Sequence, residues 1–400
     1  MNNKDYINVL SLNDNKIALL VFKKEYDDLI LLYEKNTSLN NNQICNGFIK
    51  EPEEVIKIIK QIIQDAKHIL NIDLKSLFVS IDIDKISIQD FRSERIKVPS
   101  GILDDNTWRN EILKKVNITQ ESSKHILDIS IFEWIINGKS HFSLDNQYQV
   151  NFVDVKGYMY QINRVQYEQY IKMFQTLNLD FRLIPLAMNY TSTTRSSRIK
   201  NYEMFINLNN QGLVVSVTQG NHLIISTFEK DLSLTNFITH LASETSIDKN
   251  KISEYLNNYI SIFMETTKDV KIAQSYSDKY SRIEIITSKD LNSYIARYAK
   301  KIANFIDKSI NYLKDKNDIE INNLTFLPTS DITKIIFNST KANLIMDSKI
   351  FDFEQYNLSP DYNQALLHGK AIINDISIHL YDLNNKHLKN KTKLMGIRKE

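Results

Sequence analysis

Two stretches of the chain share one pattern, in which an apolar run, four polar residues and a second apolar run follow one another. Residues 204–217 show it around the polar positions 209–212, and residues 10–21 show it around positions 13–16. The two stretches align without a gap. Asn, Asp and Gly between apolar runs are typical of turns, so each stretch predicts a hairpin. The pair indicates an internal duplication.

The first part of the chain has an α/β pattern. Apolar runs predict strands at residues 7–12, 16–22, 29–33 and 77–81, with a polar loop over 36–46. A helix is predicted from residue 51, because proline and acidic residues suit a helix N-terminus. One apolar face of this helix is expected to comprise Val55, Ile59, Ile62, Ala66 and Ile69. Strands, helix and strand together predict half of an α/β domain.

The pattern changes between residues 84 and 180. Short alternating strands are predicted at 86–89, 126–131 and 149–156, followed by a helix over 164–177. Its predicted apolar face is Tyr167, Ile171, Phe174 and Leu177. This segment therefore predicts a compact α+β insert.

The second half repeats the strand and helix order. Strands are predicted within 202–228 and at 323–327, and helices at 234–242, 252–264, 290–313 and 332–337. Thr287 and Asp290 have the spacing of a capping box at the start of the long helix. The side of this helix expected to face the core carries Leu291, Ile295, Tyr298, Ile302 and Phe305 or Ile306.

Composition limits the classes of function. A chain of 400 residues predicts two to four domains, and a net charge of +2 argues against a nucleic-acid binder. One cysteine, no signal-peptide pattern and no apolar run of membrane-spanning length predict a cytoplasmic protein with at most peripheral membrane contact. The eight histidines show no metal-ligand spacing, so no metal site is expected.

Three local motifs carry a family resemblance. They are residues 47–55 before the first helix, His125–Trp134 in the insert, and Tyr294–Tyr298 in the long helix. With the order of elements, they resemble the actin-like ATPases, and the position of the insert is similar to that in the bacterial cell-division family FtsA. The resemblance implies an actin-like, ribonuclease H-like duplicated α/β fold with an FtsA-type inserted subdomain.

The resemblance also implies a division into subdomains. Residues 1–84, 183–202 and 358–382 would form subdomain 1A, and residues 85–182 the inserted subdomain 1C. Residues 203–238 with 309–357 would form subdomain 2A. Subdomain 2B would be residues 239–308, and residues 383–400 would be a basic C-terminal tail.

The phosphate loops of the family match the two predicted hairpin turns. The positions that correspond to nucleotide-binding residues are Ser11, Asn13, Asp14, Asn15, Lys16, Asn207, Asn209, Asn210 and Gly212. The family has aspartates and glycines there, and its adenosine glycine pair falls on Leu327 and Pro328. Mg²⁺ and water need carboxylates that Ser11, Asn207 and Val214 do not supply. We therefore expect a pseudo-ATPase without a bound cofactor. Mg-ATP binding stays open as an alternative, as does Lys16 as either a phosphate contact or a solvated turn residue.

The long helix matches the one that, in the family, binds the C-terminal peptide of the tubulin-like protein FtsZ. The corresponding positions here are Arg297, Tyr298, Lys300, Lys301, Asn304 and Lys308. A basic stripe beside aromatic groups suits a short peptide that is part apolar and part acidic. A solvated lysine face explains the same pattern equally well.

The C-terminal tail resembles the amphipathic membrane helix of the family. Its apolar positions, interleaved with six basic residues, are Leu388, Leu394, Met395 and Ile397. A disordered basic tail is the alternative. The resemblance thus implies an adaptor that links FtsZ filaments to the inner face of the cell membrane and self-associates. The competing hypotheses are an actin-like ATPase with unusual loops and an actin-fold scaffold of another membrane assembly, such as a pilus-type machine.

Overall fold

The structure is a computed structural model that describes most of residues 6–351. Residues 15, 26–27, 40–42, 46, 82–85, 99–100, 104–111, 113–122, 143–147, 186–200, 221, 246, 250, 253–254, 257–268 and 278–281 lie outside the described part. The chain divides into two compact units. As far as they are described, the first unit comprises residues 1–197 and 220–226, and the second comprises residues 198–219 and 227–363.

The first unit contains a five-stranded sheet with the order β13-β6-β1-β2-β3. Its strands are β1 (Tyr6–Leu12), β2 (Lys16–Glu25), β3 (Asp28–Ser38), β6 (Ser76–Ile81) and β13 (Asp180–Pro185). The meander β1-β2-β3 is antiparallel, whereas β6 runs parallel to both β1 and β13. The central strand β1 is buried at six of its seven positions, which explains why apolar residues occupy successive positions rather than alternate ones.

Helix α1 (Pro52–Leu70) follows as predicted, with Pro in its first turn and Asn71 in the left-handed conformation at its C-terminal end. It packs on β2 and β3 through the predicted apolar face, except for Ile69, which is 66% exposed. The expected loop over 36–46 was also partly wrong. β3 extends to Ser38, and β4 (Ile44–Cys45) pairs with β5 (Phe48–Ile49), because backbone pairing continues through polar side chains.

The insert between β6 and β13 is a second sheet with the order β10-β9-β12-β7. Its strands are β7 (Ser87–Lys97), β9 (Lys124–Ile136), β10 (Lys139–His141) and β12 (Phe152–Asn163), with a small β8 (Ile102–Leu103) and β11 (Tyr148–Gln149) pair beside them. The long strands exceed the predicted lengths because bulges allow the antiparallel pairing to continue. Helix α3 (Arg164–Thr176) buries Tyr167 and Phe174 as predicted. Tyr170 and Met173 complete its buried face, whereas Ile171 and the C-cap residue Leu177, which were also expected there, are only partly buried.

The second five-stranded sheet, most of whose strands belong to the second unit, repeats the topology of the first five-stranded sheet. Its order is β16-β15-β14-β19-β20, with β14 (Tyr202–Leu208), β15 (Leu213–Gln219), β16 (His222–Glu229), β19 (Ile321–Leu327) and β20 (Ser348–Ile350). β14 is antiparallel to β15 and parallel to β19, as β1 is to β2 and β6. β14 and β1 also have identical burial patterns. The predicted duplication is therefore confirmed at the level of strand order.

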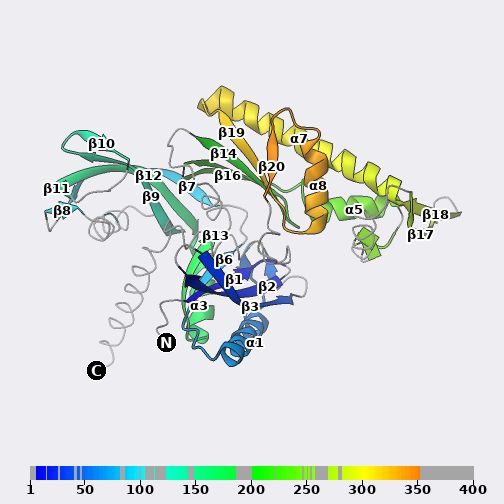
Figure 1. Cartoon of the computed structure of the whole chain (residues 1–400), viewed down its shortest axis with the longest axis horizontal. Helices are drawn as coiled ribbons and strands as arrows, with labels where there is room; N and C mark the ends of the chain where they lie inside the picture. Colours follow the sequence, from blue (N-terminus) through cyan, green and yellow to red (C-terminus); the bar gives the residue numbers. More distant parts are fainter. Residues whose placement is uncertain are drawn as a thin grey trace. The chain divides into compact units, whose positions relative to one another are not determined.

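The second unit also contains helices α5 (Leu234–Thr245), α7 (Ser288–Asn317) and α8 (Asp331–Lys341). The hairpin of β17 (Lys271–Ser277) and β18 (Arg282–Thr287) leads into α7, which runs beside α8 (Figure 1). The capping box of Thr287 and Asp290 is present as predicted. Most of the predicted helix 252–264 lies outside the described residues. No described helix is long and apolar enough to cross a membrane.

Candidate functional site

The first hairpin turn, which links β1 to β2, is closed by its own hydrogen bonds. The amide of Asn13 donates to the carbonyl oxygen of Lys16 (3.1 Å), and the amide of Lys16 donates to Oδ1 of Asn13 (2.8 Å). Ser11 is 4% exposed at the end of β1, where it pairs with Ser80. Asp14 lies near enough to Tyr170 to add to the effect of burial, which raises the pKa of that phenol. Asn15 lies outside the described residues.

The second hairpin turn, which links β14 to β15, is closed in the same way. The amide of Asn209 donates to the carbonyl oxygen of Gly212 (3.0 Å), and Oδ1 of Asn209 accepts from the amides of Gln211 and Gly212, both at 2.9 Å. Three backbone amides of this turn are therefore engaged inside the turn. In a phosphate loop, by contrast, the backbone amides point out of the loop and donate to the bound anion.

The carbonyl groups of the second turn hold the start of α5. The amide of Leu234 donates to the carbonyl oxygen of Asn209 (2.9 Å), and the amide of Thr235 donates to that of Asn210 (3.3 Å). The next amide, of Asn236, donates to Oγ of Ser233 (3.0 Å). The first three amides of α5 thus have protein partners, so this helix N-terminus does not offer them to an anion.

Gly212 is packed against its own sheet. A Cβ atom added there would lie 2.5 Å from Cζ of Phe228 and 2.7 Å from the carbonyl oxygen of Glu229. The Phe228 ring lies so close to the backbone that only the hydrogen atom of a glycine fits there. This packing explains the need for glycine at position 212 without a bound ligand. Asn207 is 1% exposed within β14, where it pairs with Leu327 of β19.

The loop that matches the adenosine glycine pair is held within the second unit. Oγ1 of Thr329, just after Pro328, donates to the carbonyl oxygen of Leu208 (3.0 Å). Ser330 and Thr333 form a capping box at the start of α8. Taken separately, each of these segments is held by hydrogen bonds within the protein, and the amides of Asn13, Lys16, Asn209, Gln211 and Gly212 all donate inside their own turns. Among the described residues, no three side chains of the metal-binding types are grouped so as to hold a metal ion.

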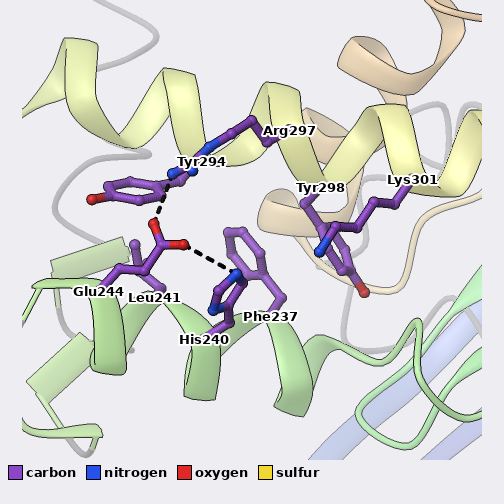
Figure 2. Close-up of a pocket in the computed structure, with 8 residues that line it drawn as sticks. All are labelled: Phe237, His240, Leu241, Glu244, Tyr294, Arg297, Tyr298 and Lys301. Atoms are coloured by element: carbon purple, nitrogen blue, oxygen red, sulfur yellow. Dashed lines mark hydrogen bonds and ion pairs between the residues drawn. The ribbon is translucent and has the colours of Figure 1, made fainter.

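A cavity lies between α5 and α7 in the second unit (Figure 2). It encloses about 100 Å³, and its apolar lining comes from Phe237 and Leu241 on α5 and from Tyr294 and Tyr298 on α7. The rings of Phe237 and Tyr298 pack at 4.9 Å between centroids, so the two helices are in contact beside the cavity. Apolar cavities of roughly 150 Å³ admit benzene, so this one suits a single aliphatic side chain.

Charged groups surround this cavity. We call the cavity and these groups together the α5–α7 groove; its residues are Phe237, His240, Leu241, Glu244, Tyr294, Arg297, Tyr298 and Lys301. The guanidinium of Arg297 lies over the Tyr294 ring, 4.7 Å from its centroid, and donates to Oε2 of Glu244 at 2.7 Å (Figure 2). Nε2 of His240 lies 3.1 Å from the other oxygen of Glu244. Lys301 also lines the groove. The rim therefore combines two permanent cations and one carboxylate around an apolar pocket.

The predicted residues of the long helix fall into three groups. Arg297 and Lys301 line the groove and are exposed. Lys300, Asn304 and Lys308 are also exposed on α7 but do not line it. Tyr298 is 7% exposed, and its hydroxyl donates to the carbonyl oxygen of Ser233 at 3.0 Å. The proposed peptide contact of Tyr298 is thus limited to its ring, because the hydroxyl is used inside the unit. The tail residues 383–400 lie outside the described residues.

Sequence reasoning missed the α5 side of the groove, which comprises Phe237, His240, Leu241 and Glu244. A weak signal was present, since His240 and Glu244 have the i, i+4 spacing of an ion pair on a helix. Nothing in the sequence linked that pair to Arg297, which is 53 residues further along the chain.

Comparisons with known proteins identify the fold. No family model matches the chain, and a search of curated proteins finds no match. A solved PilM–PilN type IV pilus biogenesis complex is similar with a TM-score of 0.60 and 10% identity, over 92% of this chain and 98% of that chain. MreB5 of Spiroplasma citri bound to ADP has a TM-score of 0.52 and 11% identity, over 94% of this chain and 100% of that chain.

A second solved structure of MreB5 from Spiroplasma citri, bound to AMPPNP, has a TM-score of 0.52 and 9% identity over 98% of this chain and 100% of that chain. The chain therefore has the actin-like ATPase fold, as the resemblance implied. At these sequence identities the similarity establishes the fold alone. The resemblance to the FtsA family and the division into four subdomains remain predictions.

Proposed function

We propose that this chain is an actin-fold scaffold protein that binds partner proteins and has lost ATP hydrolysis. The observation that carries this proposal is the second hairpin turn. Its amides close the turn, its carbonyl groups of Asn209 and Asn210 hold α5, and Gly212 packs on Phe228. A segment that would bind phosphate in an ATPase thereby positions a helix that forms one wall of the α5–α7 groove.

The groove suits a short segment that carries an aliphatic anchor beside acidic residues. The anchor would enter the apolar cavity, and a carboxylate would bind at Arg297 and Lys301 on the rim. Arginine binds carboxylates through two parallel hydrogen bonds, and the Arg297 guanidinium also lies over the Tyr294 ring. The C-terminal peptide of FtsZ has this chemistry. Under this proposal the chain is an FtsA-like adaptor for FtsZ filaments at the inner face of the cell membrane.

A pilus-type assembly is the second candidate, and the similarity to the PilM–PilN complex favours it. The fold and the groove serve both candidates, because each requires a scaffold that holds a segment of another protein. The partner peptide distinguishes them. Isothermal titration with the C-terminal FtsZ peptide is expected to show binding for an FtsA-like adaptor, and no binding for a scaffold of another assembly.

Charge reversal at Arg297 tests the groove as the peptide site. We expect Arg297→Glu to weaken FtsZ-peptide binding at least about tenfold, because it removes a cation and places a second carboxylate beside Glu244. Lys316→Glu is the matched control, since it reverses the same charge at an exposed position of α7 about 28 Å along the helix from Arg297. Equal affinities of wild type and Arg297→Glu would remove this helix from the site.

Titration with Mg-ATP tests the loss of nucleotide chemistry. We expect no heat of binding at micromolar nucleotide and no phosphate release, since the turn amides are engaged within the protein. MreB5 of Spiroplasma citri, with structures bound to ADP and AMPPNP, is the positive control. Micromolar binding with turnover would establish the ATPase alternative instead.

Membrane contact and self-association complete the proposed adaptor. The basic tail would bind anionic lipid, to which each Lys or Arg near the surface contributes about 1 kcal/mol. Co-sedimentation with anionic liposomes, compared between the full chain and a chain without residues 384–400, tests the tail. A concentration-dependent sedimentation coefficient is the expected sign of self-association, and a constant one would exclude it under those conditions.

A further inference from the structure

Glu244 lies between the two helices of the groove and binds the cation that a partner would need. Its Oε2 accepts from Arg297 at 2.7 Å, and its Oε1 lies 3.1 Å from Nε2 of His240. The Glu244 side chain is 28% exposed, whereas those of Arg297 and His240 are both 59% exposed. Figure 2 shows the carboxylate pointing from α5 toward Arg297 and Tyr294 on α7.

This arrangement affects any acidic segment that enters the groove. A partner carboxylate that binds Arg297 must replace Glu244, or share the guanidinium with it at the cost of like-charge repulsion. The pair is partly exposed, and such pairs are weak enough to exchange with a competing carboxylate. Lys301 is the other permanent cation on the rim, and it remains to attract the incoming segment.

We propose that Glu244 is a built-in competitor that occupies the carboxylate position of the groove until an acidic partner displaces it. This inference rests on the proposed function, since it assigns a role to a residue of the same groove. Glu244 would weaken the binding of any segment that has to displace it from Arg297. It would therefore favour segments with more than one acidic residue. A segment with apolar anchors and no acid would leave the Glu244–Arg297 pair intact.

Fluorescence anisotropy on the full chain tests the inference. The probe is a fluorescein-labelled synthetic peptide of three aspartates, two leucines and one phenylalanine, and its partner probe has asparagine at the three acidic positions. Glu244→Gln keeps the size of the side chain and removes its charge. Asp315→Asn is the matched control, because it makes the same charge change at an exposed position of α7, about 21 Å along the helix from Lys301 and beyond the screening length.

We expect Glu244→Gln to bind the acidic probe about three- to tenfold more tightly than wild type, with no gain for the asparagine probe and none in Asp315→Asn. The gain should shrink in 0.5 M salt, where screening is stronger. Binding by wild type that Glu244→Gln does not strengthen would overturn the competitor role while leaving the groove as the binding site. If neither protein binds the acidic probe, the groove loses its proposed function, and the competitor role falls with it.

Discussion

The role of Gly212 can be tested by adding a single carbon atom. In Gly212→Ala the new Cβ would lie 2.5 and 2.6 Å from Cζ and Cε2 of Phe228 and 2.7 Å from the carbonyl oxygen of Glu229. Carbon atoms in contact lie about 3.5–4.0 Å apart, so the ring must move by roughly 1 Å. The carbonyl group belongs to β16 and cannot rotate away alone. Overpacking of this kind destabilises by about 1–3 kcal/mol.

Hydrogen exchange measured by mass spectrometry is the appropriate assay, because it reports the local stability of the sheet that contains Gly212. We expect faster exchange in peptides that cover β14, β15 and β16. Phe228→Ala removes the ring, so the added cost of Gly212→Ala should fall by about 1 kcal/mol in that background. Gln211→Ala, in the same turn, keeps its backbone hydrogen bond to Asn209 and serves as the control.

A phosphate-binding role for Gly212 predicts a different result. The substitution would then change Mg-ATP binding and leave hydrogen exchange in the sheet unaltered. An unchanged exchange rate in Gly212→Ala, or an equal cost with and without the Phe228 ring, would refute the packing explanation.

Three further predictions follow from buried polar groups. Asp128→Ala removes the carboxylate that faces the buried Arg182 guanidinium at 3.5 Å and should cost about 3 kcal/mol, measured as a lower thermal midpoint; no shift would contradict it. Burial lowers the pKa of His222 from 6.5 to about 4, so the native state holds it neutral. Above pH 6.5 this histidine does not reduce the free energy of unfolding, because it is neutral in both the folded and the unfolded state. As the pH falls from 6.5 to 4 the unfolded state takes up a proton that the native state does not, and the free energy of unfolding decreases by about 3 kcal/mol. His222→Gln should flatten that pH dependence of the thermal midpoint, and equal slopes would exclude this cause. Tyr298→Phe deletes the hydrogen bond to Ser233 and should cost about 1 kcal/mol by chemical denaturation, whereas an unchanged midpoint would show that this bond contributes nothing.

Much of the fold could be predicted from local patterns. Both hairpin turns have the predicted residues, and the turn-closing asparagines Asn13 and Asn209 make the same side-chain hydrogen bond. The capping box of Thr287 likewise formed as predicted. These features depend on contacts between residues three positions apart, so the sequence contains all the information that they need.

Strand length and helix faces were predicted less well. β9 and β12 are longer than the apolar stretches from which they were predicted. The two strands stay paired by backbone hydrogen bonds along their length, and bulges accommodate the shifts in register. Ile69 was expected inside and is 66% exposed, because it lies in the last turn of α1, where the core no longer covers the helix. In both cases the error concerns a packing neighbour, a paired strand or the covering core, that the sequence of one segment does not specify.

The sequence by itself determined the duplicated α/β plan, the two turns without phosphate-loop glycines and the basic face of the long helix. The tertiary structure decided how these features are used. It placed Phe228 against Gly212, the start of α5 on the second turn, and Glu244 beside Arg297. The physical reason is the range of the interactions: turns and caps form between near neighbours, whereas a groove exists only after two helices pack and bring distant side chains together.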